Sequence, residues 1–187
     1  NVVVDTFYLS DAALRSLAMI ASQSGLAYEW TSVHTTVNTS NGTSGSFVSL
    51  KSASRALGST MHICETARLT DAASNSLLNE PFEVKQSQWS LGSQYLPVRP
   101  ITSECSHFLN LLYSYDSLQH CHEFAPQLDL AGFIARYGMI ACSLERSSVL
   151  QANWQATSSS RPLIAECSWA TAVNRTNFMF LRYRRLL

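Results

Sequence analysis

The residues best suited to chemistry form one run, His120-Cys121-His122-Glu123. Imidazole, thiolate and carboxylate groups are the usual ligands of zinc. Adjacent residues of an extended chain point to opposite faces, so at most His120 and His122 can share one metal ion. Two further pairs of potential ligands, each with one intervening residue, are His62/Cys64 and Cys105/His107. Closed zinc sites usually combine two spaced ligand pairs with short loops, which this sequence lacks, so we expect no bound metal.

A nucleophilic cysteine is the next candidate, and Cys142 could pair with a histidine. It lies in an apolar segment, however, where a thiol is usually inert packing. Glu145-Arg146 follows that segment and is typical of an ion pair at the end of a strand. The sequence contains no nucleophile elbow, phosphate-binding loop, dinucleotide fingerprint or zinc-protease motif. We therefore expect no catalytic residue, no cofactor and no enzymatic activity.

Cysteine usage indicates free thiols. The number of cysteines is odd and no Cys-x-x-Cys spacing occurs, which argues against a disulfide framework. We expect all five thiols to be free; they belong to Cys64, Cys105, Cys121, Cys142 and Cys167.

The charge pattern limits the range of partners. Arg182, Arg184 and Arg185 place guanidinium groups on a predicted strand, as a nucleic-acid footprint would. The 13 basic residues are balanced by 13 acidic ones, so the formal net charge is zero. A chain-wide electrostatic field is then absent, and we expect a solvated or interface edge rather than a strong nucleic-acid footprint. No apolar run reaches the roughly 18 residues of a membrane span.

The composition favours a protein that buries its surface against neighbours. Charged residues make up 14% of the chain, against about 25% in a typical soluble domain. Serine and threonine, with 28 and 13 copies, take much of their place. Such a surface keeps a free monomer poorly dispersed, and we expect a homo-oligomer.

The elements that must position these residues are mostly strands. A helix is predicted from Ser10-Asp11 to Gly25, another over residues 103–115, and a short helical stretch over 72–78. The predicted strands cover residues 2–9, 26–37, 47–50, 58–64, 81–91, 133–144, 163–171 and 178–185. Two polar loops, residues 38–45 with the hairpin dipeptide Asn41-Gly42 and residues 145–162, should reach away from the strands. Trp154 should then lie in a subunit contact or beneath its own loop.

This element order predicts an all-β protein. Strands that do not alternate with helices favour an antiparallel sandwich with short helical insertions over a doubly wound fold. The side chains expected in or near its core are Leu109, Leu112, Phe133, Met139, Trp169 and Phe180.

Four segments occur in an order that is informative as a set. Residues 88–101 combine a strand with a proline-punctuated extended run, and the helix over 103–115 follows. Next come the run Ser143-Leu-Glu-Arg-Ser-Ser-Val-Leu150 and then Arg161-Pro-Leu-Ile164. This order resembles the second jelly roll of the double jelly-roll major capsid proteins of double-stranded DNA viruses, particularly those of Polinton, adintovirus and virophage type.

The resemblance implies an antiparallel jelly roll and a structural role in a virion. Residues 1–187 are then a single jelly-roll domain, expected to be the C-terminal piece of a double jelly-roll protein. Such proteins form trimeric, pseudo-hexameric capsomers of an icosahedral shell, beside other capsid and penton proteins, and assemble inside the host cell. A single jelly-roll penton or minor capsid protein remains an alternative.

Two further alternatives stay open. A carbohydrate- or receptor-binding jelly roll could use Trp30, Tyr95 and Trp154 as stacking platforms. A cupin-like metalloenzyme would need histidines that converge inside the barrel. The histidines at 34, 62, 107, 120 and 122 are scattered over dissimilar elements, which argues against that enzyme.

Overall fold

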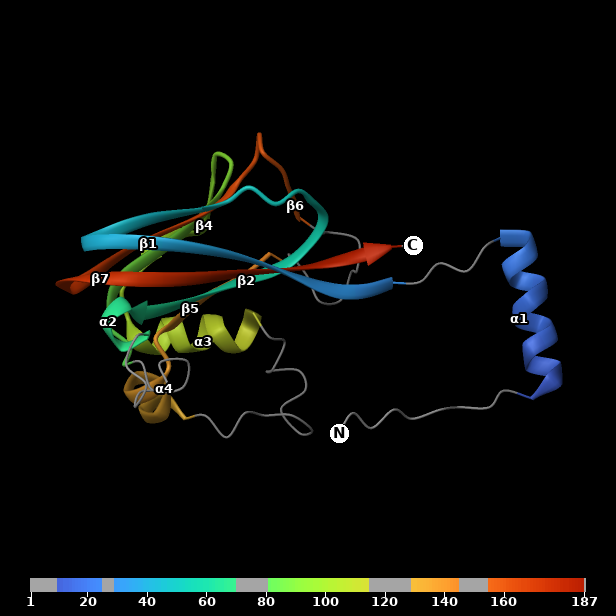
Figure 1. The fold of residues 1–187 in the computed structure, drawn as a ribbon, viewed down its shortest axis with the longest axis horizontal. Helices are drawn as coiled ribbons and strands as arrows, with labels where there is room; N and C mark the ends of the chain where they lie inside the picture. Colours follow the sequence, from blue (N-terminus) through green and yellow to red (C-terminus); the bar gives the residue numbers. More distant parts are fainter. Residues whose placement is uncertain (1–9, 25–28, 70–80, 115–128, 145–154, 187) are drawn as a thin grey trace. The chain divides into compact units, whose positions relative to one another are not determined.

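The computed structural model describes residues 10–24, 29–69, 81–114, 129–144 and 155–186 (Figure 1). The predictions for residues 2–9, 72–78 and 120–123, and those for Glu145-Arg146 and Trp154, lie outside the described residues. The chain divides into two compact units, Asn1–Trp30 with Leu186–Leu187, and Thr31–Arg185.

The first unit contains helix α1 (Asp11–Ser24), which confirms the helix predicted at Ser10-Asp11. Ser10 caps it, because its Oγ accepts a hydrogen bond from the Ala13 N–H at 3.4 Å. Leu14 and Met19 are 51% and 59% exposed on its surface. None of the helices in the described ranges is long and apolar enough to cross a membrane.

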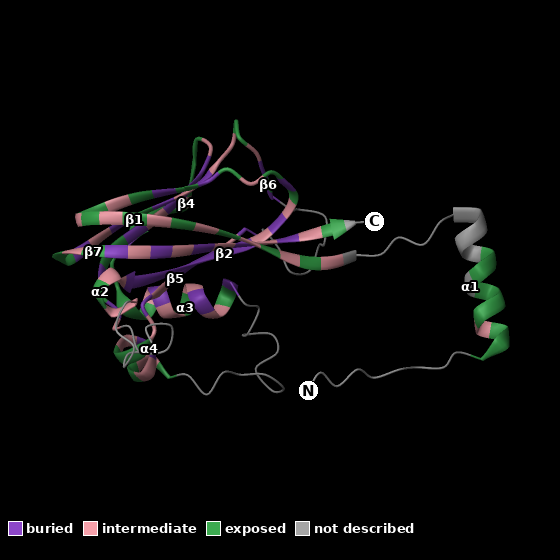
Figure 2. Ribbon diagram, in the orientation of Figure 1, coloured by how far each residue is buried: buried purple, intermediate pink, exposed green. Residues whose placement is uncertain are grey.

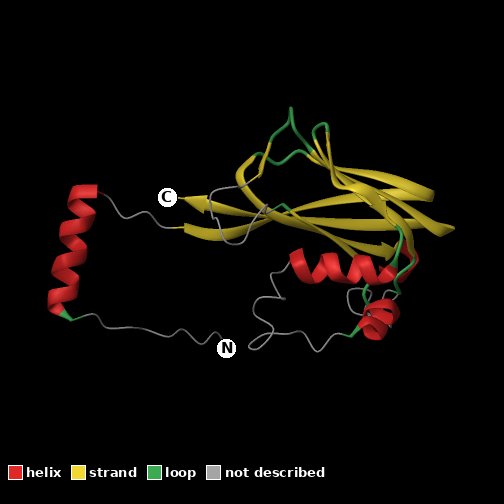
Figure 3. Cartoon of the chain, turned by 180° about the vertical axis from the view of Figure 1, so that it is seen from behind, coloured by secondary structure: helices red, strands yellow, loops and turns green. Residues whose placement is uncertain are grey.

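The second unit is built from antiparallel strands. The described residues form one curled sheet in the order β4-β3-β7-β2-β5, with β1 paired to β7 and β6 paired to β2 (Figure 3). The strand bounds are β1 (Glu29–Ser49), β2 (Ala53–Glu65), β3 (Val84–Leu91), β4 (Gln94–Ile101), β5 (Met139–Ser143), β6 (Gln155–Thr157) and β7 (Leu163–Leu186).

The two longest strands, β1 and β7, each take part in two layers. Residues 163–169 of β7 pair with β3, whereas residues 175–183 pair with β2. Along β1, Ser40 accepts a hydrogen bond from Asn177, and the Phe47 ring packs on Trp169 at 6.1 Å. One layer is therefore β1-β7-β2-β5 and the other is β1-β7-β3-β4. Both long strands pass between the layers at one corner, where Gly42 adopts a φ of 113° that favours glycine.

The core lies between the layers, because side chains of a strand alternate between its two faces. Alternate residues of β7 are buried from Leu163 to Trp169 and again from Arg175 to Tyr183, and purple bands mark this strand in Figure 2. Trp89, Phe133, Ile140 and Leu181 are almost fully enclosed beside them. Burial of such a side chain contributes about 1.5–3 kcal/mol, so this core drives the closure of the two layers.

Three helices flank the sheet: α2 (Thr66–Leu69), α3 (Glu104–Ser114) and α4 (Leu130–Arg136). Helix α3 confirms the helix predicted over residues 103–115. It packs against β5 and β2 and buries Leu111, His107 and Ser114.

The strand predicted over residues 133–144 is wrong in its first half. Residues 133–136 belong to α4, and strand β5 begins at Met139. The side chain of Asp129 caps this helix by accepting a hydrogen bond from the Gly132 N–H at 2.7 Å. A short apolar run cannot be assigned to helix or strand by periodicity alone. Here the Asp129 cap favours a helix over the start of this run.

The two predicted polar loops are also corrected. Residues 38–45 lie within β1, since pairing with β7 satisfies their backbone groups. Of the second loop, residues 155–157 form β6, and Ser158 and Arg161 close a tight turn by exchanging backbone hydrogen bonds at 3.1 Å.

The expected core is confirmed for Phe133 and Trp169, which are 0% and 3% exposed. Met139 is half-buried and packs against the core. Leu112 and Phe180 are half-buried. The prediction for Leu109 is wrong: it is 42% exposed, because it lies on the outward face of α3.

Candidate functional site

A buried arginine, Arg175, lies at the corner where β1 and β7 pass between the layers. Arg175 is 2% exposed, and its guanidinium donates to the carbonyl oxygens of Gly42, Thr171 and Val173 at 3.1–3.4 Å. It forms an ion pair with Glu83 at 2.9 Å. Its Cζ lies 4.8 Å from the centroid of the Trp169 ring, within cation–π range.

These contacts link three segments that are distant in sequence, at Gly42, Glu83 and Thr171. Arg175 donates to carbonyls of both long strands at the corner, and a buried charge needs such partners. The function of this cluster is structural. The sequence analysis missed it, although Arg175 shares the odd-numbered, inward-facing register of Trp169, Met179 and Leu181.

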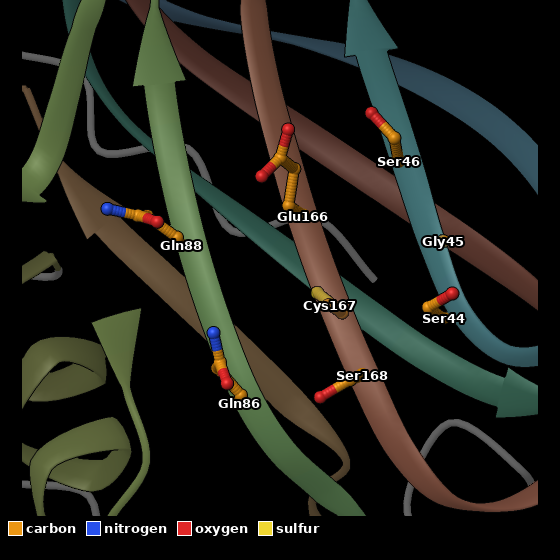
Figure 4. A pocket seen from close by; sticks show the side chains of 8 residues that line it. All are labelled: Ser44, Gly45, Ser46, Gln86, Gln88, Glu166, Cys167 and Ser168. Atoms are coloured by element: carbon orange, nitrogen blue, oxygen red, sulfur yellow. The ribbon is translucent and has the colours of Figure 1, made fainter. Parts of the chain in front are cut away.

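A shallow polar hollow lies on the outer face of the β1-β7-β3 layer (Figure 4). It has a volume of about 380 Å³. Gln86 and Gln88 of β3 stand beside Ser168 and Glu166 of β7, their respective partners in the ladder. Its lining is completed by Ser44, Gly45, Ser46 and Cys167. With one carboxylate among neutral hydroxyl and amide groups, this face can make wide polar contacts at a small cost of charge desolvation.

The outer face of the other layer is apolar where β1 and β7 lie side by side. Ser40 bonds to the inward-facing Asn177, so odd-numbered residues of β1 share the outward face with even-numbered residues of β7. Val33 and Val37 are 55% and 56% exposed on this face. Phe178 and Phe180 of β7 are half-buried on the same face. Aliphatic and aromatic side chains side by side on a strand surface are typical of a contact site.

Strand β4 exposes a third surface. Tyr95 is 52% exposed and Val98 84% exposed. Pro97 and Pro100 remove two backbone donors from this strand, which protects the sheet edge against uncontrolled strand pairing.

The two histidine and cysteine pairs that the structure describes, His62/Cys64 and Cys105/His107, do not form a shared metal site. His62 Nδ1 and Cys64 Sγ are 3.0 Å apart, both buried, and burial lowers the pKa of His62. Cys105 is exposed, whereas His107 is buried with its Nδ1 3.3 Å from Ser87 Oγ. Burial lowers the pKa of His107 to about 4. No group of three potential metal ligands occurs in the part of the chain that the structure describes.

Cys142 lies on β5 with its thiol enclosed. Burial raises the pKa of Cys142 to about 12, so the reactive thiolate is scarce at neutral pH. Burial, with the nearby Glu166 carboxylate, also raises the pKa of Cys167. These thiols pack as small apolar groups, as the sequence analysis expected for Cys142.

Of the proposed stacking platforms, the structure describes Trp30 and Tyr95. Trp30 is half-buried at the start of β1, and Tyr95 lies on β4. None of the residues that line the hollow of Figure 4 is aromatic.

Two antiparallel layers that share their two long strands, built from the seven strands of the described residues, define the fold as a jelly roll. The structure of PBCV-1 VP54, fitted into a cryo-EM reconstruction of the virophage Sputnik, matches this chain with a TM-score of 0.53 and 10% identity. The match covers 96% of this chain and 52% of the VP54 chain, so the chain spans about half the length of that neighbour. The major capsid protein P2 of bacteriophage PM2 matches with a TM-score of 0.43 and 8% identity, over 84% of this chain and 45% of that one.

No protein-family model and no curated protein matches the sequence. The likeness to VP54 confirms, at the level of the fold, the resemblance to double jelly-roll capsid proteins.

Proposed function

We propose that this chain is a structural subunit of an icosahedral virus shell, located in the virion capsid. The observation that carries the proposal is the jelly roll shared with VP54 over 96% of the chain. Residues 1–187 would be the C-terminal jelly roll of a double jelly-roll subunit, three of which form a pseudo-hexameric capsomer. Neighbouring capsid and penton proteins would be its partners, and assembly would take place inside the host cell.

The surfaces of the sandwich support this role. A permanent interface of this kind buries on the order of 2,000 Å² or more, with an apolar centre and a polar rim. The outward face with Val33 and Val37 offers an apolar centre. The polar hollow of the other layer offers neutral hydrogen-bonding groups. The chain therefore carries two outer faces of different chemistry, as a subunit with neighbours on two sides requires.

The double jelly-roll form is proposed over a single one because VP54, which shares the fold of this chain, is a double jelly-roll protein of which the match covers 52%. A single jelly-roll penton or minor capsid protein is the alternative within the same class. A carbohydrate-binding module has less support, because the polar hollow lacks an aromatic stacking surface. An enzymatic role is not part of the proposal, and among the described residues the Cys142 thiol is enclosed, with its pKa raised by burial to about 12.

Cryo-microscopy of the native particle tests the assignment. The expected result is a shell of pseudo-hexameric capsomers into which the jelly roll fits with three copies per capsomer. A map in which the chain fits at the fivefold vertices alone would favour the penton alternative. A particle without icosahedral order would overturn the capsid role.

A matched pair of variants tests the apolar face. Val33→Lys with Val37→Lys should block capsomer formation, because it buries two charges at the centre of an interface. Ala131→Lys with Ala135→Lys, on exposed positions of α4, adds the same charge elsewhere and should assemble normally. Assembly is measured by analytical ultracentrifugation, with circular dichroism to show that both variants fold.

A further inference from the structure

Strand β4 forms a bulge on the outer face of the β1-β7-β3-β4 layer. The ladder between β3 and β4 shifts register around Gln88, so that residues 97–100 stand opposite this single residue. Residues 97–100 are all exposed, and Val98 is 84% exposed. A bulge in a strand directs side chains away from the plane of the sheet. We call residues 97–100 the β4 bulge.

Contacts with its own chain hold the β4 bulge in place. Gln88 Nε2 donates hydrogen bonds to the carbonyl oxygens of Pro97 and Val98, at 3.3 and 3.2 Å. Pro97 and Pro100 also fix their own φ angles. An exposed segment that is already ordered loses little conformational entropy when it binds, which favours the β4 bulge as a contact site.

The polar hollow of Figure 4 adjoins the β4 bulge, because Gln88 takes part in both. The Gln88 side chain lines the hollow, and its amide nitrogen points away from Glu166. Glu166 is the ladder partner of Gln88, is exposed, and carries the one carboxylate among the residues that line the hollow. The β4 bulge carries the exposed cation Arg99. One surface therefore combines a convex part with a positive charge and a concave part with a negative charge.

The two parts are complementary in charge. A partner that covered Glu166 without bringing a positive charge would leave a desolvated carboxylate unpaired, which is unfavourable. A guanidinium supplies this charge and binds a carboxylate through two parallel hydrogen bonds. The Arg99 side chain of a second copy has the chemistry that the hollow requires.

The two parts are also arranged for exchange. The convex and concave parts are neighbours on one surface, so two copies related by a two-fold axis can each insert the β4 bulge into the hollow of the other. Pro97 and Pro100 lack backbone donors, which disfavours the addition of a strand at this edge. Contact through side chains is then the mode of association that this surface favours.

We propose that the β4 bulge and the polar hollow form a self-complementary surface through which two copies of this chain associate. Arg99 of each copy binds Glu166 of the other, and the contact buries Val98. Tyr95, which is 52% exposed on the same strand, widens the contact. The inference rests on this surface alone and does not depend on assembly into a shell.

Analytical ultracentrifugation of the full chain measures the association. All proteins carry Val33→Lys and Val37→Lys, so that contacts through the apolar face do not obscure the result. The chain with these two changes, the parent here, should dimerise. Arg99→Glu and Glu166→Arg each place like charges at both contacts, so each should raise the dissociation constant of the dimer at least about 100-fold. A parent that stays monomeric up to its solubility limit would overturn the proposal.

A mixture of the two single variants gives the sharpest test. The Arg99→Glu chain has glutamate at both positions and the Glu166→Arg chain has arginine at both, so both contacts of a mixed dimer join opposite charges. A heterodimer should form with nearly the affinity of the parent, although neither variant associates alone. An ion pair within one chain cannot produce this recovery. Failure of the mixture to associate would refute the pairing of Arg99 with Glu166.

Charge-matched controls and a neutral position complete the design. Arg136→Glu and Glu104→Arg change exposed residues of α4 and α3 by the same charges and should dimerise as the parent does. Equal losses in these controls would show that net charge, and not this surface, governs association. If a test variant does not fold, Val98→Asp alters a side chain that is 84% exposed and should weaken the dimer at least about tenfold. An unchanged dimer in Val98→Asp would contradict the proposal.

Discussion

Single buried polar residues hold the corner of this jelly roll, and Arg175 is the clearest of them. Its guanidinium is the common donor for carbonyls on β1 and β7 and for the Glu83 carboxylate. Since these acceptors come from three segments, the loss of the Arg175 side chain would leave acceptors in all three segments without their donor. Removal of a buried, well-bonded charge destabilises the fold mainly because its former hydrogen-bond acceptors are left without a donor.

Replacement of Arg175 with alanine should lower the free energy of unfolding by about 3–5 kcal/mol, because buried acceptors lose their donor. Glu83→Gln is the control, since the Glu83 side chain is 44% exposed and an amide can still accept from Arg175. This second change should cost less than Arg175→Ala, because Arg175 keeps its carbonyl acceptors and an amide oxygen in place of the carboxylate. Denaturant unfolding measures both, and equal midpoints for Arg175→Ala and the parent would refute the corner's role.

His107 predicts a dependence of stability on pH. Burial lowers its pKa from 6.5 to about 4, so the imidazole is neutral in the folded state. As the pH falls below 6.5, the unfolded chain takes up the proton first, and stability is lost down to about pH 4, where the folded state also becomes protonated. The full effect is about 3 kcal/mol. His62, whose pKa is also lowered, contributes in the same direction.

The measurement compares the urea midpoint of the parent and of His107→Gln across this pH range. Carboxylates titrate in both proteins, so the difference between the two curves isolates His107. The parent should lose more stability than the variant between pH 6.5 and pH 4. Parallel curves would show that His107 is not enclosed as the structure places it.

At the scale of elements, helix α3 presents two leucines to opposite environments. Leu111 is 4% exposed against the sheet, and Leu109 is 42% exposed on the outer side. Leu111→Ala should cost about 2–4 kcal/mol, whereas Leu109→Ala should cost less than about 1 kcal/mol. Thermal unfolding monitored by circular dichroism checks the pair. Similar losses for the two variants would mean that the outer face of α3 is covered.

Much of the strand and helix content could be predicted from periodicity. The alternation along residues 163–171 and 178–185 marks the inward face of β7, and the capped amphipathic pattern of residues 103–115 marks α3. Leu109 misled the prediction because a helix with many apolar residues does not show which side faces the sheet. That choice depends on packing against β5 and β2, which are distant in sequence.

Elements without apolar residues were harder to predict. Residues 38–45 contain serine, threonine, asparagine and glycine, the composition of a loop. They form a strand because β7 offers its backbone as a partner, and Gly45 is needed there because an added Cβ would lie 2.5 Å from the Phe47 ring.

At the scale of the whole molecule, the reactivity of the buried thiols measures how often the core between the two layers becomes accessible to solvent. Cys64, Cys142 and Cys167 are buried, and Cys105 is exposed. In a Cys105→Ser, Cys121→Ser background, the remaining three thiols should react with a thiol reagent only as fast as the protein unfolds. Rapid reaction in native buffer would show that the layers open locally, and a shortfall of free thiols after denaturation would reveal a disulfide.

The sharing of β1 and β7 between both layers has a consequence for the time course of synthesis. Ser40 and its partner Asn177 are 137 positions apart, so the contact order of the fold is high. At about 5–20 residues per second, β1 leaves the ribosome roughly 7–27 s before its partner strand exists. Neither layer is complete during that interval, because both include β7. The apolar faces of β2 and β3 therefore stay exposed to solvent. Protection of the nascent chain by a chaperone should therefore determine how many subunits reach the folded state.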